Sequence, residues 1–250
     1  MIEVASIVDL VAAADVIISI CPPGDAETVA HSVAETDFGG LYVDANAIAP
    51  ETAKTIAPLF DRFVDGSVVG PPVTPRAASN TDDGPQRSTT RLYLSGDPAD
   101  TALVASLWEH GNLECRVVGE LPGAASAVKM CFASWTKIGS ALLLDVLALA
   151  DSEGVTGALL AEWETSMPEM VERSNRQGAA VAPKAWRFVG EMEQIAAAYR
   201  HADLPDGFAV GAAEIYQRLA HFAPSDTPAA GLADESTSRQ AVIDALRRMV

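Results

Sequence analysis

The chain has 250 residues, a formal net charge of -17 and a hydrophobic fraction of 49%. This length suffices for one large or two modest domains, each with its own buried core. The acidic excess, 34 Asp and Glu against 17 Lys and Arg, argues against nucleic acid as a partner, because phosphate binding needs clustered cations.

Membrane and export signals are also missing from the sequence pattern. The apolar runs are interrupted too often for a membrane span, and the N-terminus has no basic segment followed by a cleavage site, so we expect a cytoplasmic protein. Cys21, Cys115 and Cys131 lack the spacing of a zinc site or a disulfide framework, and we interpret them as reduced core residues.

Short apolar runs alternate with helical patterns in the first half of the chain. Apolar runs without polar alternation favour strands buried on both faces of a parallel sheet. We predict strands at 15–20, 41–44, 63–69, 91–94 and 114–118. Helices are predicted at 5–14, 25–35 and 50–60, and a further helix follows Asp97 and continues through 108. This alternation indicates βαβ crossovers and an α/β doubly wound sheet. Residues 70–90, dense in Pro, Ser, Thr, Asp and Asn, predict a long irregular loop.

The strand signal ends after Val118, and the second half is predicted to be all-α. Helical patterns cover 122–153, 156–174, 183–201, 205–221 and 235–249. Pro122 is expected in the first turn of the first of these helices, where its missing N–H has no consequence. We place the domain boundary near Gly119, with a sheet domain at 1–119 and a helical domain at 120–250.

Six segments in this order resemble the β-hydroxyacid dehydrogenase family, which includes 3-hydroxyisobutyrate and 6-phosphogluconate dehydrogenases. They are 14–23 (ADVIISICPP), 43–50 (VDANAIAP), 64–72 (VDGSVVGPP), 94–97 (LSGD), 123–129 (GAASAVK) and 185–193 (AWRFVGEME). The chain looks most like the branch with a distinct phosphogluconate-dehydrogenase-like C-terminal domain. The resemblance implies a Rossmann-like sheet, NADP or NAD as cofactor, and a homodimer formed through the helical substrate domain.

One part of the family pattern is absent from this sequence. Family members open with a strand, a Gly-x-Gly-x-x-Gly turn and a helix whose N–H groups hold the cofactor pyrophosphate. No such motif occurs here, so we expect an N-terminally truncated Rossmann-like sheet. Either the chain is a piece of a longer enzyme, or the segment has been lost and tight dinucleotide binding with it, leaving no cofactor. The strand that would choose between NAD and NADP belongs to the missing part.

Lys129 is the candidate catalytic residue. Hydride transfer at a hydroxyl carbon needs a group that takes or gives the hydroxyl proton, and a lysine whose pKa is lowered by burial can do so. The resemblance places the family's catalytic lysine here, among the apolar neighbours Val128 and Met130. The structural alternative is a solvated lysine on an exposed helix face. The family's asparagine one turn later is Ala133 in this chain, so one substrate hydrogen bond is missing.

The remaining site residues follow from the resemblance. Those expected to bind substrate are Ser67, Val69, Gly70, Gly123, Ala133 and Glu191. Those expected to line the cofactor site are Cys21, Pro22, Pro23 and Asn46. Residues Gly66 to Pro72 match the family's loop that holds a carboxylate through a hydroxyl and small residues, but the hydroxyl position is Val69, which indicates an altered substrate. As bare sequence, these segments are ordinary strand exits. The histidines lack metal-ligand spacing, so no metal is expected.

Two classes of function remain open at this point. The first is an NAD(P)-dependent oxidoreductase that acts on a small hydroxy or keto substrate, with Lys129 as general acid/base. The second is a non-redox scaffold: a pseudoenzyme or binding protein without dinucleotide binding, or a cofactor-independent acid/base enzyme that uses Lys129. The substrate itself cannot be named from the sequence.

Overall fold

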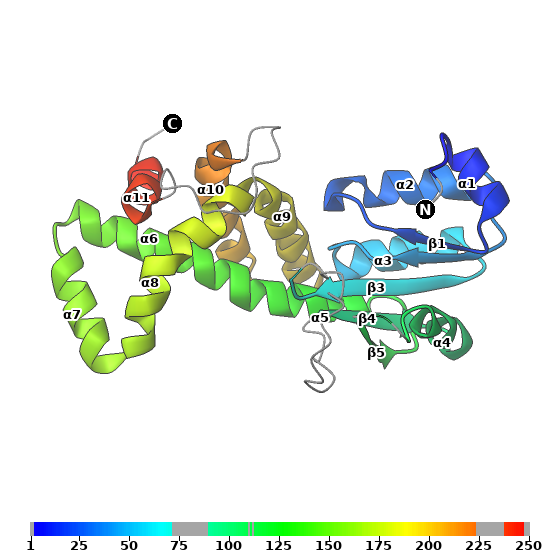
Figure 1. Ribbon diagram of the computed structural model, residues 1–250, viewed down its shortest axis with the longest axis horizontal. Coiled ribbons are helices and arrows are strands. Elements are labelled where there is room, and N and C mark those ends of the chain that lie inside the picture. Colours follow the sequence, from blue (N-terminus) through cyan, green and yellow to red (C-terminus); the bar gives the residue numbers. More distant parts are fainter. Residues whose placement is uncertain (1–2, 72–89, 110, 112, 224–237, 248–250) are drawn as a thin grey trace, which may run out of the picture. The chain divides into compact units, whose positions relative to one another are not determined.

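The computed structural model describes residues 3–71, 90–109, 111, 113–223 and 238–247 (Figure 1). It divides into two compact units, Met1–Phe132 and Ala133–Val250. The boundary predicted at Gly119 lies at the end of the last strand, and the first unit continues beyond it. Most of the loop predicted at 70–90, including Pro72, lies outside the described residues.

A five-stranded sheet forms the centre of the first unit. Its strands, in spatial order, are β1 (Val16–Ser19), β2 (Leu41–Asp44), β3 (Phe63–Val69), β4 (Arg91–Gly96) and β5 (Glu114–Gly119). β1, β2 and β3 are parallel, as are β4 and β5, but β4 is antiparallel to β3. The predicted α/β class and the Rossmann-like, mostly parallel sheet are confirmed. The antiparallel pair was not predicted; the intervening sequence carries no helical pattern for a parallel crossover.

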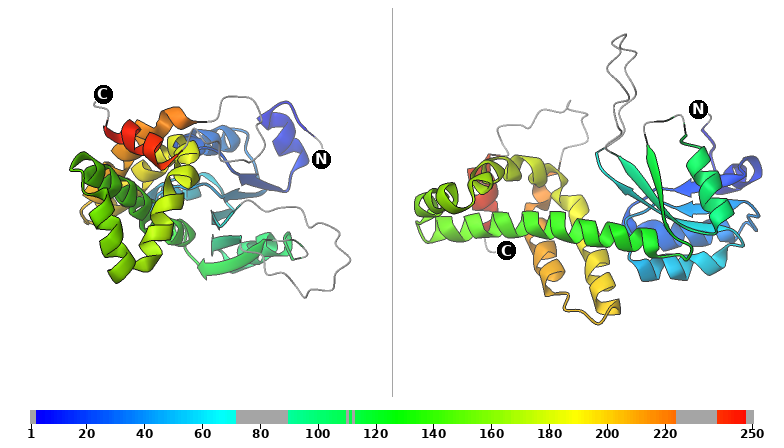
Figure 2. Two further views of the ribbon diagram at one scale, coloured as in Figure 1. Left: turned by 60° about the vertical axis from the view of Figure 1, so that its left-hand side comes forward. Right: turned by 90° about the horizontal axis from the view of Figure 1, so that it is seen from below.

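Helices cover both faces of this sheet (Figure 2). They are α1 (Ile7–Ala13), α2 (Ala26–Ala34), α3 (Pro50–Ile56), α4 (Pro98–Ser106) and α5 (Ala124–Ala133), with 3-10 turns at Pro23–Asp25 and Ala57–Leu59. Local side-chain chemistry explains where several of these helices begin. Ser6 caps α1, and the Asp97 side chain accepts hydrogen bonds from the Ala99 and Asp100 amides at the start of α4. Pro50 and Pro98 each occupy a first turn, where an N–H is not needed.

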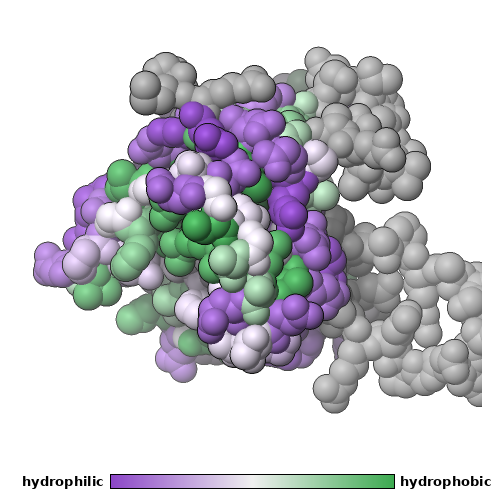
Figure 3. Space-filling view, turned by 90° about the vertical axis from the view of Figure 1, so that its left-hand side faces the viewer, coloured by the Kyte–Doolittle hydropathy of each residue, from purple (hydrophilic) through white to green (hydrophobic). Residues whose placement is uncertain are grey.

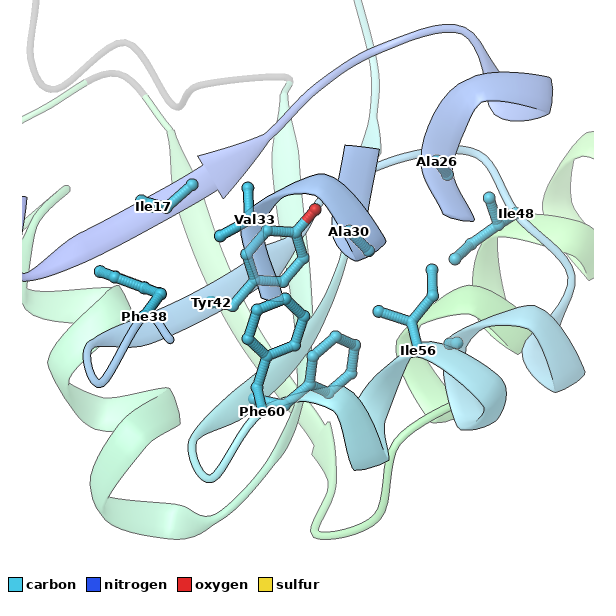
Figure 4. Close-up of a cluster of buried hydrophobic side chains, with 11 residues drawn as sticks. Ile17, Ala26, Ala30, Val33, Phe38, Tyr42, Ile48, Ile56 and Phe60 are labelled. Atoms are coloured by element: carbon cyan, nitrogen blue, oxygen red, sulfur yellow. The ribbon is translucent and has the colours of Figure 1, made fainter. Parts of the chain in front are cut away.

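Two apolar cores lie on opposite faces of the sheet. On one face α2 and α3 pack over Tyr42, whose ring stacks on Phe60 with centroids 4.1 Å apart (Figure 4). On the other face Val104 of α4 packs with Leu41, Val43, Val64, Leu92 and Leu94. The central strands are therefore buried on both sides, which explains why their sequences are continuous apolar runs.

The second unit is all-helical in its described residues, as predicted. It contains α6 (Gly139–Ser152), α7 (Thr156–Ser166), α8 (Pro168–Val181), α9 (Ala185–His201), α10 (Gly207–Leu219) and α11 (Arg239–Arg247), with 3-10 turns at Ala182–Lys184 and Ala220–Phe222. The prediction of one helix over 156–174 was wrong. Pro168 begins α8 after a break at Met167, because proline lacks the N–H that a continuous helix requires.

The long helical stretch Ala124–Ser152 combines α5, a π-helical segment at Ser134–Ile138, and α6. Pro122 precedes this helix, contrary to the prediction, since α5 begins only at Ala124. By length and composition the stretch could cross a membrane, but core helices of soluble proteins pass the same test; 39% of its most apolar window is buried. Cys131 is exposed, which corrects its assignment to the core, and Cys21 and Cys115 are half-buried free thiols.

Candidate functional site

A row of polar side chains crosses the sheet where β1 and β2 end. Ser19 pairs with Asp44, Asp44 with Asp65, and Asp65 with Ser95 on four successive strands. All four residues are buried, and both aspartates are 0% exposed. Because charged side chains are rarely buried without partners, two neighbouring buried carboxylates mark this edge of the sheet as a candidate site. In open α/β sheets, ligands bind beyond the carboxyl ends of the strands.

Asn46 joins the ends of β1 and β2. Its backbone N–H donates to Asp44 Oδ1 at 3.0 Å, and its Nδ2 donates to Asp44 Oδ2 at 3.0 Å and to Ser19 Oγ at 3.1 Å. Its Oδ1 accepts from the Cys21 amide at 2.6 Å. The side-chain amide of Asn46 is thus engaged within the protein and fixes the loop after β1 to the loop after β2.

Asp44 has an unusual protonation equilibrium. Burial raises its pKa to about 6, the hydrogen bonds from Asn46 oppose the rise, and the charge of Asp65 adds to it. The free energy of unfolding should therefore fall as pH rises from about 4 to about 7, because the folded state resists ionisation of Asp44 more than the unfolded state does.

The substitution Asp44→Asn should remove this pH dependence. We expect the wild-type free energy of unfolding, taken relative to that of D44N, to fall on the order of 3 kcal/mol between about pH 4 and about pH 7. Urea unfolding of both proteins at the two pH values measures it. The subtraction cancels the other titrating groups. If the free energy of unfolding of the wild type minus that of D44N were the same at both pH values, the pKa of Asp44 would be that of an ordinary aspartate.

Asp65 and Ser95 together satisfy the start of α5. Asp65 Oδ2 accepts from the Gly123 amide at 2.9 Å and the Ser126 amide at 3.0 Å, and Oδ1 accepts from Ser126 Oγ at 2.6 Å. Ser95 Oγ donates to Asp65 Oδ2 at 3.0 Å and accepts from the Ala125 amide at 3.1 Å. Burial raises the pKa of Asp65, and these hydrogen bonds counteract the rise. These first amides of a helix have no partner inside it, so β3 and β4 supply the cap.

Lys129 lies one turn beyond Ser126 on the same helix. Its Nζ donates to the Val68 carbonyl of β3 at 2.6 Å, and burial lowers its pKa. In the part of the chain that the structure describes, no carboxylate forms an ion pair with this amine, and the hydrogen bond to the Val68 carbonyl uses one of the three N–H groups of the ammonium. Lys129 is therefore a half-buried amine with donor positions left for a ligand, rather than the solvated lysine of the structural alternative.

The predicted substrate loop lies next to this lysine along β3. Ser67 is 0% exposed, and its Oγ has no hydrogen-bond partner among the described residues. Val69 is 3% exposed and pairs with Arg91 of β4, so it fills the sheet rather than facing solvent. Gly70 follows with φ 131° and is exposed. Of these residues, Ser67 supplies an unsatisfied polar group near the carbonyl that holds Lys129.

Gly123 is the turn residue that α5 requires. Its φ is 99°, which disfavours other residue types, and an added Cβ would lie 3.0 Å from the Pro50 carbonyl oxygen. The Gly123 carbonyl accepts the Ala127 amide at 2.9 Å, the first hydrogen bond of the helix. Its position is therefore structural: it brings the amides of α5 to Asp65.

The predicted cofactor loop follows β1 directly. Cys21 is half-buried, its thiol lies 3.9 Å from Ser19 Oγ, and burial raises its pKa. Pro22 precedes the short turn Pro23–Asp25 that leads into α2, and neither proline has an N–H to offer. Ile20 is 73% exposed immediately before them. This loop presents apolar surface and carbonyl groups rather than amide donors.

Glu191 and Ala133 lie in the second unit. Glu191 forms an ion pair with Lys137, whose ammonium also lies 4.3 Å from the centre of the Phe188 ring. The Tyr216 hydroxyl donates to the Lys137 carbonyl at 2.6 Å, which fixes the π-helical segment. Lys137 is therefore a paired structural residue. Ala133 is 1% exposed and carries no polar group.

Sequence reasoning did not identify Asp44, Asp65, Ser95 and Ser126. A signal was available: Val43-Asp44 and Val64-Asp65 each place a carboxylate inside an apolar strand run. No group of three or more His, Cys, Asp or Glu able to hold a metal occurs among residues 3–71, 90–109, 111, 113–223 and 238–247.

Comparison with known families and proteins identifies relatives for both halves. Residues 150–219 match a domain of unknown function, DUF1932. A curated relative from Methanothermus fervidus, an uncharacterized 28.5 kDa protein encoded in the 7S RNA 5' region, is 29% identical over 154 residues. That match covers 61% of this chain and 54% of the relative, so the chain spans about half the length of the curated protein it matches.

Solved structures share the fold over most of the chain. One is a conserved protein of unknown function that was reported as structurally similar to 3-hydroxyacid dehydrogenases. It is 27% identical to this chain with a TM-score of 0.59, and the match covers 87% of this chain and 79% of that protein. The 3-hydroxyisobutyrate dehydrogenase of Mycobacterium tuberculosis, solved with L-serine, has 18% identity, a TM-score of 0.61 and coverages of 96% and 82%. Psf3, solved with NADP+ and 2-OPP, has 19% identity, a TM-score of 0.55 and coverages of 86% and 77%.

Proposed function

Because the chain has the fold of the 3-hydroxyacid dehydrogenase-like proteins and carries a DUF1932 match in its helical half, we propose that it is an NAD(P)-dependent oxidoreductase. Its substrate is a small hydroxy or keto compound, and Lys129 is the general acid/base. The observation that carries the proposal is the half-buried Lys129 amine, which donates to a strand carbonyl and forms no ion pair with a carboxylate of the described residues.

The chemistry of Lys129 follows from its surroundings. Burial lowers the pKa of the amine, which brings it closer to the range where one group can both give and take a proton. In oxidation, neutral Nζ takes the proton of the substrate hydroxyl; in reduction, the ammonium returns it to the carbonyl oxygen. The Val68 carbonyl holds the amine in one orientation in both directions. Ser67 is a substrate residue by the resemblance, and its Oγ is fully buried without a partner among the described residues.

The residues present fit one half of a nicotinamide dinucleotide. The loop Cys21 to Pro23, anchored by Asn46, and exposed Ile20 offer the apolar surface that a nicotinamide or adenine ring needs at the strand ends. The sequence contains no Gly-x-Gly-x-x-Gly turn to hold the pyrophosphate. When bound, NADP or NAD supplies or accepts the hydride. The residues of this chain move the proton and orient the substrate.

An absorbance assay of nicotinamide reduction tests the proposal. The purified chain is incubated with a panel of small 2- and 3-hydroxy acids and either NAD+ or NADP+, and the reverse reaction is run with keto acids and the reduced cofactors. We expect turnover with at least one substrate class. Absence of turnover across the panel in both directions would favour the non-redox alternative.

The alternative is a scaffold without redox chemistry, such as a pseudoenzyme, a binding protein or a cofactor-independent acid/base enzyme. Specific features favour it: Ala133 has no polar group, Val69 is buried in the sheet, and the Asn46 amide is engaged internally. A ligand that binds near Lys129 without any nicotinamide requirement would support this alternative. The cytoplasm remains the expected location for either function.

We also propose that the helical unit forms a homodimer. Leu142 and Leu149 of α6 are 56% and 63% exposed and lie seven residues apart, a spacing typical of helix–helix contacts, and Trp135 in the preceding π-helical segment is 81% exposed. Figure 3 faces the α7 end of the helical unit and shows that apolar side chains are also exposed among hydrophilic ones on that end. A second copy of the chain would bury such a stripe against its own counterpart.

The double substitution Leu142→Glu with Leu149→Glu should convert the dimer to monomers. Charged side chains in a helix interface lose their hydration without gaining partners. Light scattering coupled to size-exclusion chromatography measures the mass. Leu121→Glu, at a leucine of the first unit that is 76% exposed, is the control and should leave the dimer intact. A wild-type monomer, or a dimer that survives the double substitution, would contradict this interface.

A further inference from the structure

The start of α5 is held by side chains from distant strands instead of by its own sequence. Gly123, whose carbonyl accepts the first helical hydrogen bond, has no side chain with which to cap the helix. The Gly123 and Ser126 amides instead donate to Asp65 of β3, and the Ala125 amide donates to Ser95 of β4. All of these residues are buried, so water cannot replace the missing cap.

Strand β3 contacts the same helix a second time through Lys129. Ser126, which gives both its amide and its hydroxyl to Asp65, lies three residues before Lys129, so the two side chains share one face of α5. The Lys129 ammonium then reaches the Val68 carbonyl, three residues after Asp65 on β3. The helix start and the lysine tip are therefore both fixed to one short length of the same strand.

We propose that Asp65 is the positioning residue for Lys129: its carboxylate fixes the first turn of α5 so that the lysine amine rests on the Val68 carbonyl. Asp65 acts through Ser126 and Gly123, and it need not touch substrate. The catalytic meaning of this assignment rests on the proposed function, but the positioning itself is a property of the folded chain.

Two consequences distinguish positioning from a general contribution to stability. Without the carboxylate, the first turn loses the acceptor of Gly123 and Ser126, α5 shifts, and Lys129 leaves the strand for water. Hydration then returns the Lys129 pKa upward to its ordinary value of about 10.4. Loss of the Asp65 charge alone would move that pKa in the opposite direction, because removing a nearby negative charge disfavours the ammonium.

Lysine titration by NMR tests the proposal without any substrate or cofactor. The chain is labelled with 13C at lysine Cε, and the signals of Lys54, Lys129, Lys137 and Lys184 are followed against pH. Lys129→Arg assigns the signal. The variants are Asp65→Ala, which removes the cap, and Asp65→Asn, which keeps an oxygen and a donor in place. Asp44→Ala removes the equally buried carboxylate on the neighbouring strand and is the matched control.

We expect the Lys129 titration to move up to the ordinary value in D65A, to show no upward shift in D65N, and to stay at the wild-type position in D44A. Should D65A fail to fold, Ser126→Ala and Ser95→Ala, which remove single members of the cap, should each shift the titration upward by a smaller amount. The proposal is overturned if the Lys129 pKa in folded D65A, or in both serine variants, equals that of the wild-type protein. The proposal is also overturned if D44A raises the Lys129 pKa as much as D65A does, because the shift would then reflect general destabilisation. Lack of dehydrogenase activity affects none of these outcomes.

Discussion

Replacement of Lys129 by alanine should abolish measurable turnover while leaving the fold intact. A positioned general acid/base contributes about 10²- to 10⁴-fold to rate, and Lys129 is the amine that the Val68 carbonyl holds in place. The side chain is only half-buried, and its removal leaves the Val68 carbonyl accessible to water. Turnover is measured with the nicotinamide absorbance assay, and circular dichroism checks the fold.

Lys54→Ala is the matched control for this substitution. Lys54 is an exposed lysine of the same unit, in a surface ion pair with Glu51, which contributes little to stability. Its removal should leave turnover unchanged. Activity of Lys129→Ala equal to that of Lys54→Ala would remove Lys129 from the mechanism.

The substitution Asp65→Ala should destabilise the protein more than any other single substitution among the site residues. The Gly123 amide, the Ser126 amide and the Ser126 hydroxyl would all lose a buried acceptor. Each buried polar group left without a partner costs about 1 to 3 kcal/mol, so we expect the free energy of unfolding to fall by about 3 kcal/mol or more. Urea unfolding near neutral pH measures the change.

Asp97→Ala offers the comparison for this prediction. Asp97 also accepts two amides at a helix start, but it is exposed, so water can replace it and the loss should be about 1 kcal/mol. If the free energy of unfolding fell equally in the two variants, the buried Asp65 cap would stabilise the protein no more than a surface cap does.

The sequence predicted the sheet well because burial on both faces leaves a clear local pattern. The predicted ranges for β2 and β3 match the structure residue for residue, since Leu41–Asp44 and Phe63–Val69 are short apolar runs between turn signals. The break at Pro168 was missed because the helical pattern of 156–174 was read through a residue that should have ended it. The π-helical segment has no local signature, since it depends on contacts such as that of Tyr216 with the Lys137 carbonyl.

The site was predicted less completely than the fold. Lys129 was proposed because the resemblance places the family's catalytic lysine at this position, after a turn and a helix start in an apolar context. Asp65 was not, because its partners are 30 to 61 residues away and only the fold brings them together. For the same reason, the sequence could not show that the Asn46 amide is engaged by Ser19, Cys21 and Asp44 rather than directed to a ligand.

Titration of the purified chain with NADPH and NADH tests the central claim most directly, because every step of the proposed chemistry needs a nicotinamide at the strand ends. Binding is followed by the fluorescence of the reduced cofactor. The account predicts saturable binding of at least one of the two, with a Kd below about 1 mM. Unchanged fluorescence with both cofactors up to millimolar concentration would contradict it and leave the non-redox scaffold as the function of this chain.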